Sequence, residues 1–137
     1  MARKFKVEIV TPEKVVFSGE AESLVVPADR GYLGVLAGHA PLLAALRPGR
    51  VAIRAEGGEK RYATAGGFME VTPRQTTLLT ESAEEAGAID VARAEKAKRR
   101  AEERLASSDP STDKERARAA LERAQNRLRT ASKEKRA

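Results

Sequence analysis

The chain contains few residues of the kinds that carry out chemistry. Its 137 residues include one histidine, His39, and no cysteine. A metal site at His39 would need further ligands and a catalytic dyad would need a nucleophile, and neither occurs at a recognisable spacing. The lack of cysteine also excludes a disulfide framework. Since no nucleophile, base and orienting group occur together, a stand-alone enzyme is the least favoured class.

His39 lies in a glycine-rich segment, residues 31–43, that lacks the pattern of a strand. Gly31, Gly34 and Gly38 permit positive φ angles and the close approach of another backbone. We therefore expect an irregular segment here. His39 is expected either to bond a nearby carbonyl group or to take part in docking, because loop tips on rigid β scaffolds are favoured contact surfaces.

Residues 1–87 have the pattern of an antiparallel β-sandwich or barrel. Phe5, Val7 and Ile9 alternate with charged residues, which is the period of a half-buried strand. Pro48-Gly49, Gly66-Gly67 and Pro73-Arg74 mark breaks, and Gly57-Gly58 predicts a tight hairpin. Short β-rich runs separated by regular turn signals are typical of sandwiches and barrels. The further strands expected are residues 14–18, 23–26, 51–56, 59–64, 68–71 and 76–80.

Residues 88–137 predict a hairpin of two antiparallel helices, which makes the fold class α+β. All ten glycines and all aromatic residues precede residue 88. Asp90 is expected to be the N-cap of a helix over residues 91–106. Ser107-Ser108-Asp109-Pro110 ends that helix. Thr112 and Glu115 form a capping box for a second helix that runs to about Lys133.

The expected contact between the two helices is rich in alanine. Alanine permits close approach but buries little apolar surface, so each helix should be strong while their mutual grip is weak. A weak contact between strong helices is what a two-state element requires. The expected contact residues are Val91, Ala94, Ala97, Ala101 and Leu105 on the first helix, and Ala117, Leu121, Ala124, Leu128 and Ala131 on the second.

The net charge of +6 comes entirely from the helical segment. Residues 1–87 hold 11 basic and 11 acidic residues, whereas residues 88–137 hold 15 and 9, and 15 − 9 = 6. A basic balance suggests nucleic acid, but the positive charge lies on helices without aromatic residues, as on a solvated face. The sequence shows no signal peptide and no stretch of transmembrane length, so a cytosolic protein is expected.

Five stretches, in this order and spacing, resemble the epsilon subunits of F-type ATP synthases. They are VTPE at 10–13, FSG at 17–19, LGVL at 33–36 followed by GHAPL at 38–42, GGFMEV at 66–71, and IDVARA at 89–94. The resemblance implies a non-catalytic subunit of the central rotor stalk, whose sandwich joins the gamma subunit to the membrane c-ring. It also implies helices that move between a folded form and an extended form that reaches the alpha/beta catalytic hexamer and restrains ATP hydrolysis.

The same resemblance implies a location and a ligand. The subunit would be peripheral, on the cytoplasmic face of the bacterial cell membrane, and associated with the membrane only through the complex, without nucleic acid. In some bacterial members ATP binds the folded hairpin as a regulatory ligand that is not hydrolysed, and no metal or catalytic cofactor is implied. The positions that match the family's ATP site are Glu84, Ile89, Asp90, Arg93, Ala94, Arg100, Arg123 and Arg127.

The spacing of the arginines agrees with this implication. Arg93 and Arg100 are two turns apart on one helix face, and Arg123 and Arg127 are one turn apart. In a closed hairpin they would gather four guanidinium groups for a triphosphate. The plainer interpretation is that arginine recurs on any helix this basic and that Asp90 is only a cap.

The chain departs from the family in two segments. In the glycine-rich segment that meets the c-ring, represented by Tyr32, Gly38 and His39, Tyr32 replaces a common glutamate and Ala37 a common proline. Asp109-Pro110 stiffens the turn between the helices, so opening would swing two rods instead of fusing them. When extended, the second helix could pair with acidic segments of the beta subunits through Arg116, Arg118, Arg123, Arg127 and Arg129.

Two alternatives remain. A nucleic-acid-associated protein would use the basic hairpin and bind with a steep salt dependence. A generic adaptor would anchor through its β module and form a coiled coil with a partner helix, and copurification would reveal that partner.

Overall fold

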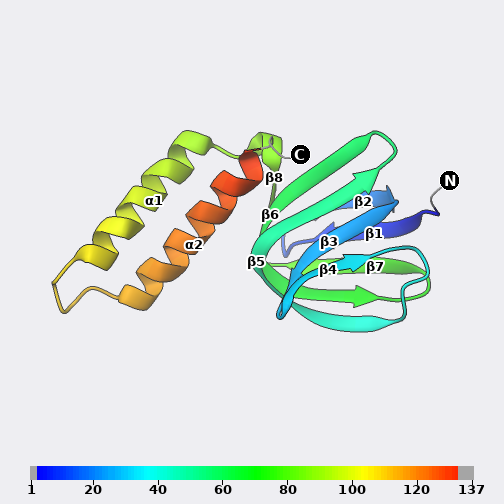
Figure 1. Ribbon diagram of the computed structural model, residues 1–137, viewed down its shortest axis with the longest axis horizontal. Coiled ribbons are helices and arrows are strands. Elements are labelled where there is room, and N and C mark those ends of the chain that lie inside the picture. The colour runs from blue at the N-terminus through cyan, green and yellow to red at the C-terminus, as the bar shows by residue number, and fades with distance from the viewer. Residues whose placement is uncertain (1–2, 133–137) are drawn as a thin grey trace. The chain divides into compact units, whose positions relative to one another are not determined.

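The computed structural model describes residues 3–132 and confirms the α+β class (Figure 1). The chain divides between Glu85 and Ala86 into a β unit and a helical unit, each of which is described by itself below. The strands are β1 (Phe5–Val10), β2 (Val15–Ala21), β3 (Ser23–Ala28), β4 (Gly31–Val35), β5 (Leu42–Ala55), β6 (Gly58–Val71), β7 (Gln75–Thr80) and β8 (Ala83–Glu85). A 3₁₀ turn, η1 (Ala86–Ala88), precedes the helices α1 (Val91–Ala106) and α2 (Lys114–Ala131).

The sandwich is one continuous sheet whose two longest strands belong to both layers. The strand order is β2-β1-β7-β6-β5-β3-β4, and β8 pairs with the first part of β6. The second half of β6 pairs with β7, while the second half of β5 pairs with β3. All neighbours are antiparallel except β1 and β7, which are parallel. The long strands therefore connect the layers without a separate crossover.

The core of the β unit is built from the alternating residues that the sequence indicates. Val7 and Ile9 of β1 are fully buried, and so are Met69 of β6 and Leu78 of β7. Phe17 lies against the core and meets the Tyr62 ring edge-on, with ring centroids 6.3 Å apart. Burial, assisted by the negative charge of Glu85, raises the pKa of Tyr62 to about 12.

The structure corrects the expectation of an irregular glycine-rich segment. Residues 31–35 form β4, which pairs with β3 from Gly31 opposite Ala28 to Val35 opposite Leu24. The alternation is hidden in the sequence because Gly31 and Gly34 contribute no side chain to either face. The expected breaks at 48–49 and 66–67 are wrong as well, since β5 and β6 continue through them.

The Gly66-Gly67 pair is needed because the backbones come close together inside the sheet. Gly67 has φ +144°, and a Cβ atom there would collide with the carbonyl oxygen of Leu79 on β7. Glycine thus permits strand pairing here instead of ending it. The tight hairpin predicted at Gly57-Gly58 is present one residue earlier, with Ala55 paired to Gly58.

The helical unit is an antiparallel hairpin, as Figure 1 shows. Asp90 is the N-cap of α1, as predicted, and its carboxylate accepts a bond from the Arg93 amide at 3.0 Å. The predicted capping box of Thr112 is wrong, because Asp113 caps α2 by accepting from the Arg116 amide at 3.0 Å. Since Asp113, one position after Thr112, takes the capping role, the Thr112 hydroxyl instead donates to the Ser107 hydroxyl at 3.4 Å. The predicted helix end at Lys133 lies outside the described residues.

The contact between the helices is made mainly of alanine. Ala94 and Ala101 of α1 and Ala117 and Ala124 of α2 are buried, whereas the leucines at 105, 121 and 128 are only half-buried. Val91 was expected in this contact, but its side chain is 46% exposed. Its position in the first turn puts it to one side of the line through the buried alanines. The contact therefore has the alanine-rich composition that the sequence predicts.

Candidate functional site: an arginine face on the helical hairpin

An arginine directly precedes each of the four buried alanines of the hairpin. In an antiparallel pair, the two helices are related by an approximate two-fold axis that runs between them, perpendicular to their common plane. Rotation about that axis exchanges the two helices but does not exchange the two faces of the hairpin. A residue that directly precedes a contact residue therefore lies on the same face of the hairpin in both helices. The four pairs are Arg93-Ala94, Arg100-Ala101, Arg116-Ala117 and Arg123-Ala124.

Two more arginines lie on this face, one turn after the second arginine of each helix. At about 100° per residue, all six lie roughly 80–120° to one side of the contact. The glutamates of the two helices lie on the other side or at the back. We call this set the arginine face: Arg93, Arg100 and Arg104 of α1, and Arg116, Arg123 and Arg127 of α2.

The arginine face is accessible and concentrates positive charge. Arg127 is half-buried and the other five arginines are exposed. Within residues 3–132, no carboxylate lies within ion-pair distance of Arg93, Arg100 or Arg123. Guanidinium groups offer paired donors that match the oxygens of phosphate, so this face can bind a phosphorylated anion.

The hairpin brings the four predicted arginines together on one face. Because the helices are antiparallel, Arg93 lies close to the level of Arg123 and Arg127, and Arg100 lies two turns, about 10 Å, nearer the loop. Sequence reasoning left Arg104 unassigned and gave Arg116 only a role in pairing with the beta subunits. The signal that could have found them is the same run in both helices, two Arg-Ala pairs seven residues apart followed by an Arg-Leu pair.

The other residues of the predicted site have different surroundings. Ile89 and Ala94 are 8% and 3% exposed and so contribute mainly to packing. The Asp90 carboxylate is exposed and caps α1, as the plainer interpretation has it. Glu84 belongs to the β unit, where it lies in β8 opposite Ala63 of β6.

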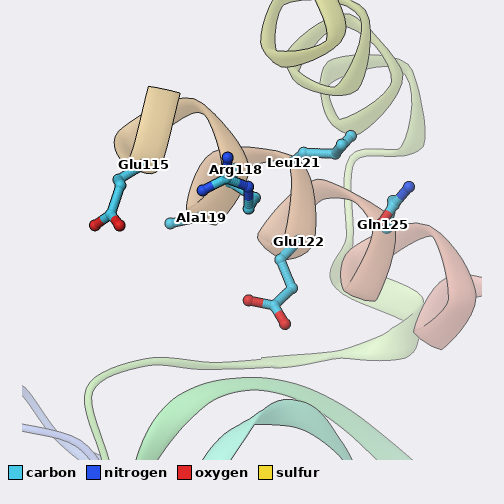
Figure 2. Close-up of a pocket in the computed structure, with 6 residues that line it drawn as sticks. All are labelled: Glu115, Arg118, Ala119, Leu121, Glu122 and Gln125. Carbon is cyan, nitrogen blue, oxygen red and sulfur yellow. The ribbon is translucent and has the colours of Figure 1, made fainter. Parts of the chain in front are cut away.

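A hollow on α2 differs from the arginine face in its charge. It has a volume of about 440 Å³ and is bordered by the carboxylates of Glu115 and Glu122 and by Arg118, as Figure 2 shows. Two carboxylates repel an anion, and one guanidinium does not offset them. None of the predicted ATP-binding residues borders this hollow.

The outer side of the β unit carries an apolar stripe. The strand registers align five apolar residues in one row across five adjacent strands, which spans about 20 Å at the usual strand spacing. Phe68 and Leu79 face each other in this row and are 55% and 53% exposed. A contiguous exposed apolar row is typical of a docking surface. The apolar stripe consists of Ala45, Phe68, Leu79, Val10 and Val15.

The glycine-rich segment separates the three residues assigned to docking. Tyr32 lies in β4, and its hydroxyl oxygen accepts a bond from the Arg50 amide at 3.3 Å. Gly38 and His39 lie in the turn after that strand, where Nδ1 of His39 donates to the Ala40 carbonyl at 2.7 Å. The expected bond from His39 to a nearby carbonyl is therefore confirmed, and the docking role stays a prediction.

The described part of the chain lacks both a cluster of metal ligands and a membrane-spanning helix. Residues 3–132 contain no group of three or more histidine, cysteine, aspartate or glutamate residues that could hold a metal ion. No helix in the same range has the length and apolar character needed to cross a membrane.

Comparison with known families assigns both units. Residues 4–86 match the model described as "ATP synthase, Delta/Epsilon chain, beta-sandwich domain", and residues 88–132 match "ATP synthase, Delta/Epsilon chain, long alpha-helix domain". The chain therefore belongs to the delta/epsilon chain family of ATP synthases, which accounts for both the sandwich and the hairpin.

Similar curated proteins are named ATP synthase epsilon chain, a non-catalytic subunit. The protein of Desulforamulus reducens is 46% identical over 96% of this chain and 99% of its own length. That of Moorella thermoacetica is 48% identical over 90% of this chain and 93% of its own. A chain in the Euglena gracilis mitochondrial ATP synthase structure shares the fold, with a TM-score of 0.80 and 24% identity over 90% of this chain and 78% of that one.

Proposed function

We propose that this chain couples the gamma subunit to the c-ring in the central stalk of a rotary ATP synthase and restrains ATP hydrolysis. Its relatives are named epsilon chains, and the Euglena structure with the same fold is described as containing the F1 part and the c-ring. The subunit acts at the cytoplasmic face of a bacterial cell membrane and reaches the membrane only through the complex.

The observation that carries the regulatory part is an arginine face on a hairpin closed by alanine. Ala94, Ala101, Ala117 and Ala124 form the buried part of the contact, and alanine buries little apolar surface. The closed hairpin is thus held weakly enough for a ligand to influence its opening. An anion that bridges arginines of both helices binds only the closed form and therefore stabilises it.

ATP is the anion proposed for this face. Arg93, Arg100, Arg123 and Arg127 supply guanidinium groups for the triphosphate, and Asp90 and Glu84 accept hydrogen bonds from the adenine or ribose. ATP is a regulatory ligand that is bound and released unchanged.

Calorimetric titration of the full chain with ATP, and with ADP for comparison, tests this site. We expect heat of binding for the wild type and its loss in Arg93→Ala. The matched control is Arg99→Ala, which removes an exposed arginine of α1 from outside the arginine face. Equal loss in both variants, or no heat at millimolar ATP with the wild type, would eliminate the site.

The two hairpin states are proposed to compete for the same charges. When extended, Arg123 and Arg127 pair with acidic segments of the catalytic beta subunits, and when folded they hold ATP. Replacing both with glutamine should weaken ATP binding and also relieve the restraint on hydrolysis in the reassembled complex. If both measurements stayed at the wild-type level, the idea of shared charges would be abandoned.

The apolar stripe is proposed to dock on the gamma subunit. Phe68→Asp and Leu79→Asp would each place a charge where apolar surface is removed from water, so copurification with gamma should decrease strongly. Val25→Asp is the control, because Val25 is exposed on β3 outside the stripe. Undiminished recovery of gamma with both stripe variants would rule out this surface.

Contact with the c-ring is assigned to the segment of Tyr32, Gly38 and His39. Leu36 and Leu43, next to the turn with His39, are 62% and 70% exposed and offer apolar surface for that contact. Leu36→Asp should therefore reduce recovery of the c-ring while gamma is still recovered. A c-ring yield equal to that of the wild type would place the contact elsewhere.

A further inference from the structure

The two helices repeat one pattern of arginine, alanine and leucine. In α1 the pattern Arg-Ala, five residues, Arg-Ala, two residues, Arg-Leu begins at Arg93 and ends at Leu105. In α2 the same pattern begins at Arg116 and ends at Leu128. Equal spacing in antiparallel helices makes the arginine face approximately symmetric about the axis between them.

The symmetry gives the arginine face two similar ends. Arg93 and Arg127 lie at the end next to η1, and Arg104 and Arg116 lie at the end next to the loop. Arg100 and Arg123 lie between these pairs. The arginines of each helix extend over 11 residues, or about 16 Å at 1.5 Å per residue. The site proposed for ATP uses one end and the centre, which leaves the loop end, Arg104 and Arg116, available to a longer ligand.

We propose that the arginine face binds a linear inorganic phosphate chain longer than a triphosphate, with Arg104 and Arg116 holding the part that extends toward the loop. The proposal deepens the phosphate site of the proposed function and rests on it. Six guanidinium groups in two rows provide bidentate partners for successive phosphates along the hairpin. Such a chain would bridge both helices along most of the contact and stabilise the closed form more than ATP does.

A phosphate chain suits this surface better than a nucleic acid does. Single-stranded nucleic acids are usually held by basic grooves together with aromatic side chains on which the bases stack. The chain's aromatic residues are Phe5, Phe17, Tyr32, Tyr62 and Phe68, all of which belong to the β unit. The arginine face thus supplies partners for phosphate and none for stacked bases.

The test compares ligands and variants of the full chain at one fixed ionic strength. Calorimetry would measure the affinity for ATP, inorganic tripolyphosphate and long-chain polyphosphate. The loop-end variant is Arg104→Gln with Arg116→Gln. The matched control is Arg99→Gln with Arg118→Gln, which removes the same charge from exposed positions outside the arginine face.

We expect long-chain polyphosphate to bind the wild type more tightly than tripolyphosphate. The loop-end variant should lose about tenfold in affinity for the long chain, equivalent to about 1.4 kcal/mol, and keep its affinity for ATP. The control variant should lose much less.

Four outcomes would overturn the proposal: equal affinity for the short and long phosphate chains, equal losses in the two variants, equally tight binding of single-stranded DNA, or equally tight binding of poly-glutamate. Long-chain binding without ATP binding would reject ATP as the regulatory ligand and support the longer anion.

Discussion

Lys114 joins the two helices at the loop end of the hairpin. Its Nζ donates to the carbonyl oxygens of Leu105 and Ser107, each at 2.6 Å. The last carbonyl groups of a helix have no partner within the helix, so a lysine from α2 supplies what α1 lacks. Lys114→Met keeps most of the apolar stem and removes the ammonium group, and we expect it to loosen the closed turn.

The expected magnitude follows from two opposing effects. A hydrogen bond to a charged group contributes about 1.5–3 kcal/mol, but Lys114 is only part-buried, and water can replace it at both carbonyls. Lys114 is also the first residue of α2, where a positive charge is unfavourable by about 0.3–1 kcal/mol. The net loss should therefore be about 1–2 kcal/mol, which corresponds to about 5- to 30-fold more opening.

Amide hydrogen exchange of residues 101–107 measures that opening directly. In the closed turn, the Ser107 amide donates to the Arg104 carbonyl at 3.2 Å, and it should exchange faster in Lys114→Met by the factor given above. Lys96→Met is the control, because it removes an exposed lysine of α1. Exchange no faster in Lys114→Met than in this control would refute the reasoning that the lysine holds the helices together.

Three further predictions follow from single contacts. Gly67→Ala should lower the free energy of unfolding in urea by on the order of 3 kcal/mol, because the added Cβ would collide with Leu79. Gly87→Ala is the control: no heavy atom lies within 4 Å of its added Cβ, so stability should change by less than about 0.5 kcal/mol. Asp113→Ala should lower the free energy of unfolding by about 1 kcal/mol, measured by thermal unfolding followed by circular dichroism, and Thr112→Ala should lower it less. A larger loss in Thr112→Ala would instead support the capping box. The pKa of Tyr62 is about 12 in the folded chain and near 10 in the unfolded chain, so the unfolded chain loses this proton at lower pH. The free energy of unfolding should therefore fall between pH 10 and pH 12 by about 1.4 kcal/mol per pH unit. An equally steep fall in Tyr62→Phe would contradict this assignment.

The elements of the fold were largely readable from local chemistry, and the errors at the glycines of the strands share one cause. Asp90 was correctly predicted as a cap because an aspartate before a helical run bonds its own first turn. Segments 31–35 and 66–67 were misread because glycine in isolation signals a turn. Whether a glycine ends a strand or lets another backbone approach depends on what lies opposite, and for Gly67 that is Leu79, which is distant in sequence.

The candidate site was also predicted only as far as neighbours along one helix allow. Arg93, Arg100, Arg123 and Arg127 could be chosen for the anion site from spacing and resemblance, whereas Arg104 and Arg116 were not assigned to that site. Spacing within one helix says which residues share a face of that helix. It does not say which face of the partner helix lies on the same side, because that depends on the antiparallel arrangement.

The sequence by itself determined the two units, the start and end of the first helix, the alanine-rich contact and the segregation of positive charge. These properties depend on neighbours within a few positions along the chain. Only the tertiary structure decided that β5 and β6 run through both layers, that five apolar residues from five strands form one stripe, and that six arginines share one face. Those properties depend on strand register and on the two-fold relation between helices, which the whole packed chain sets.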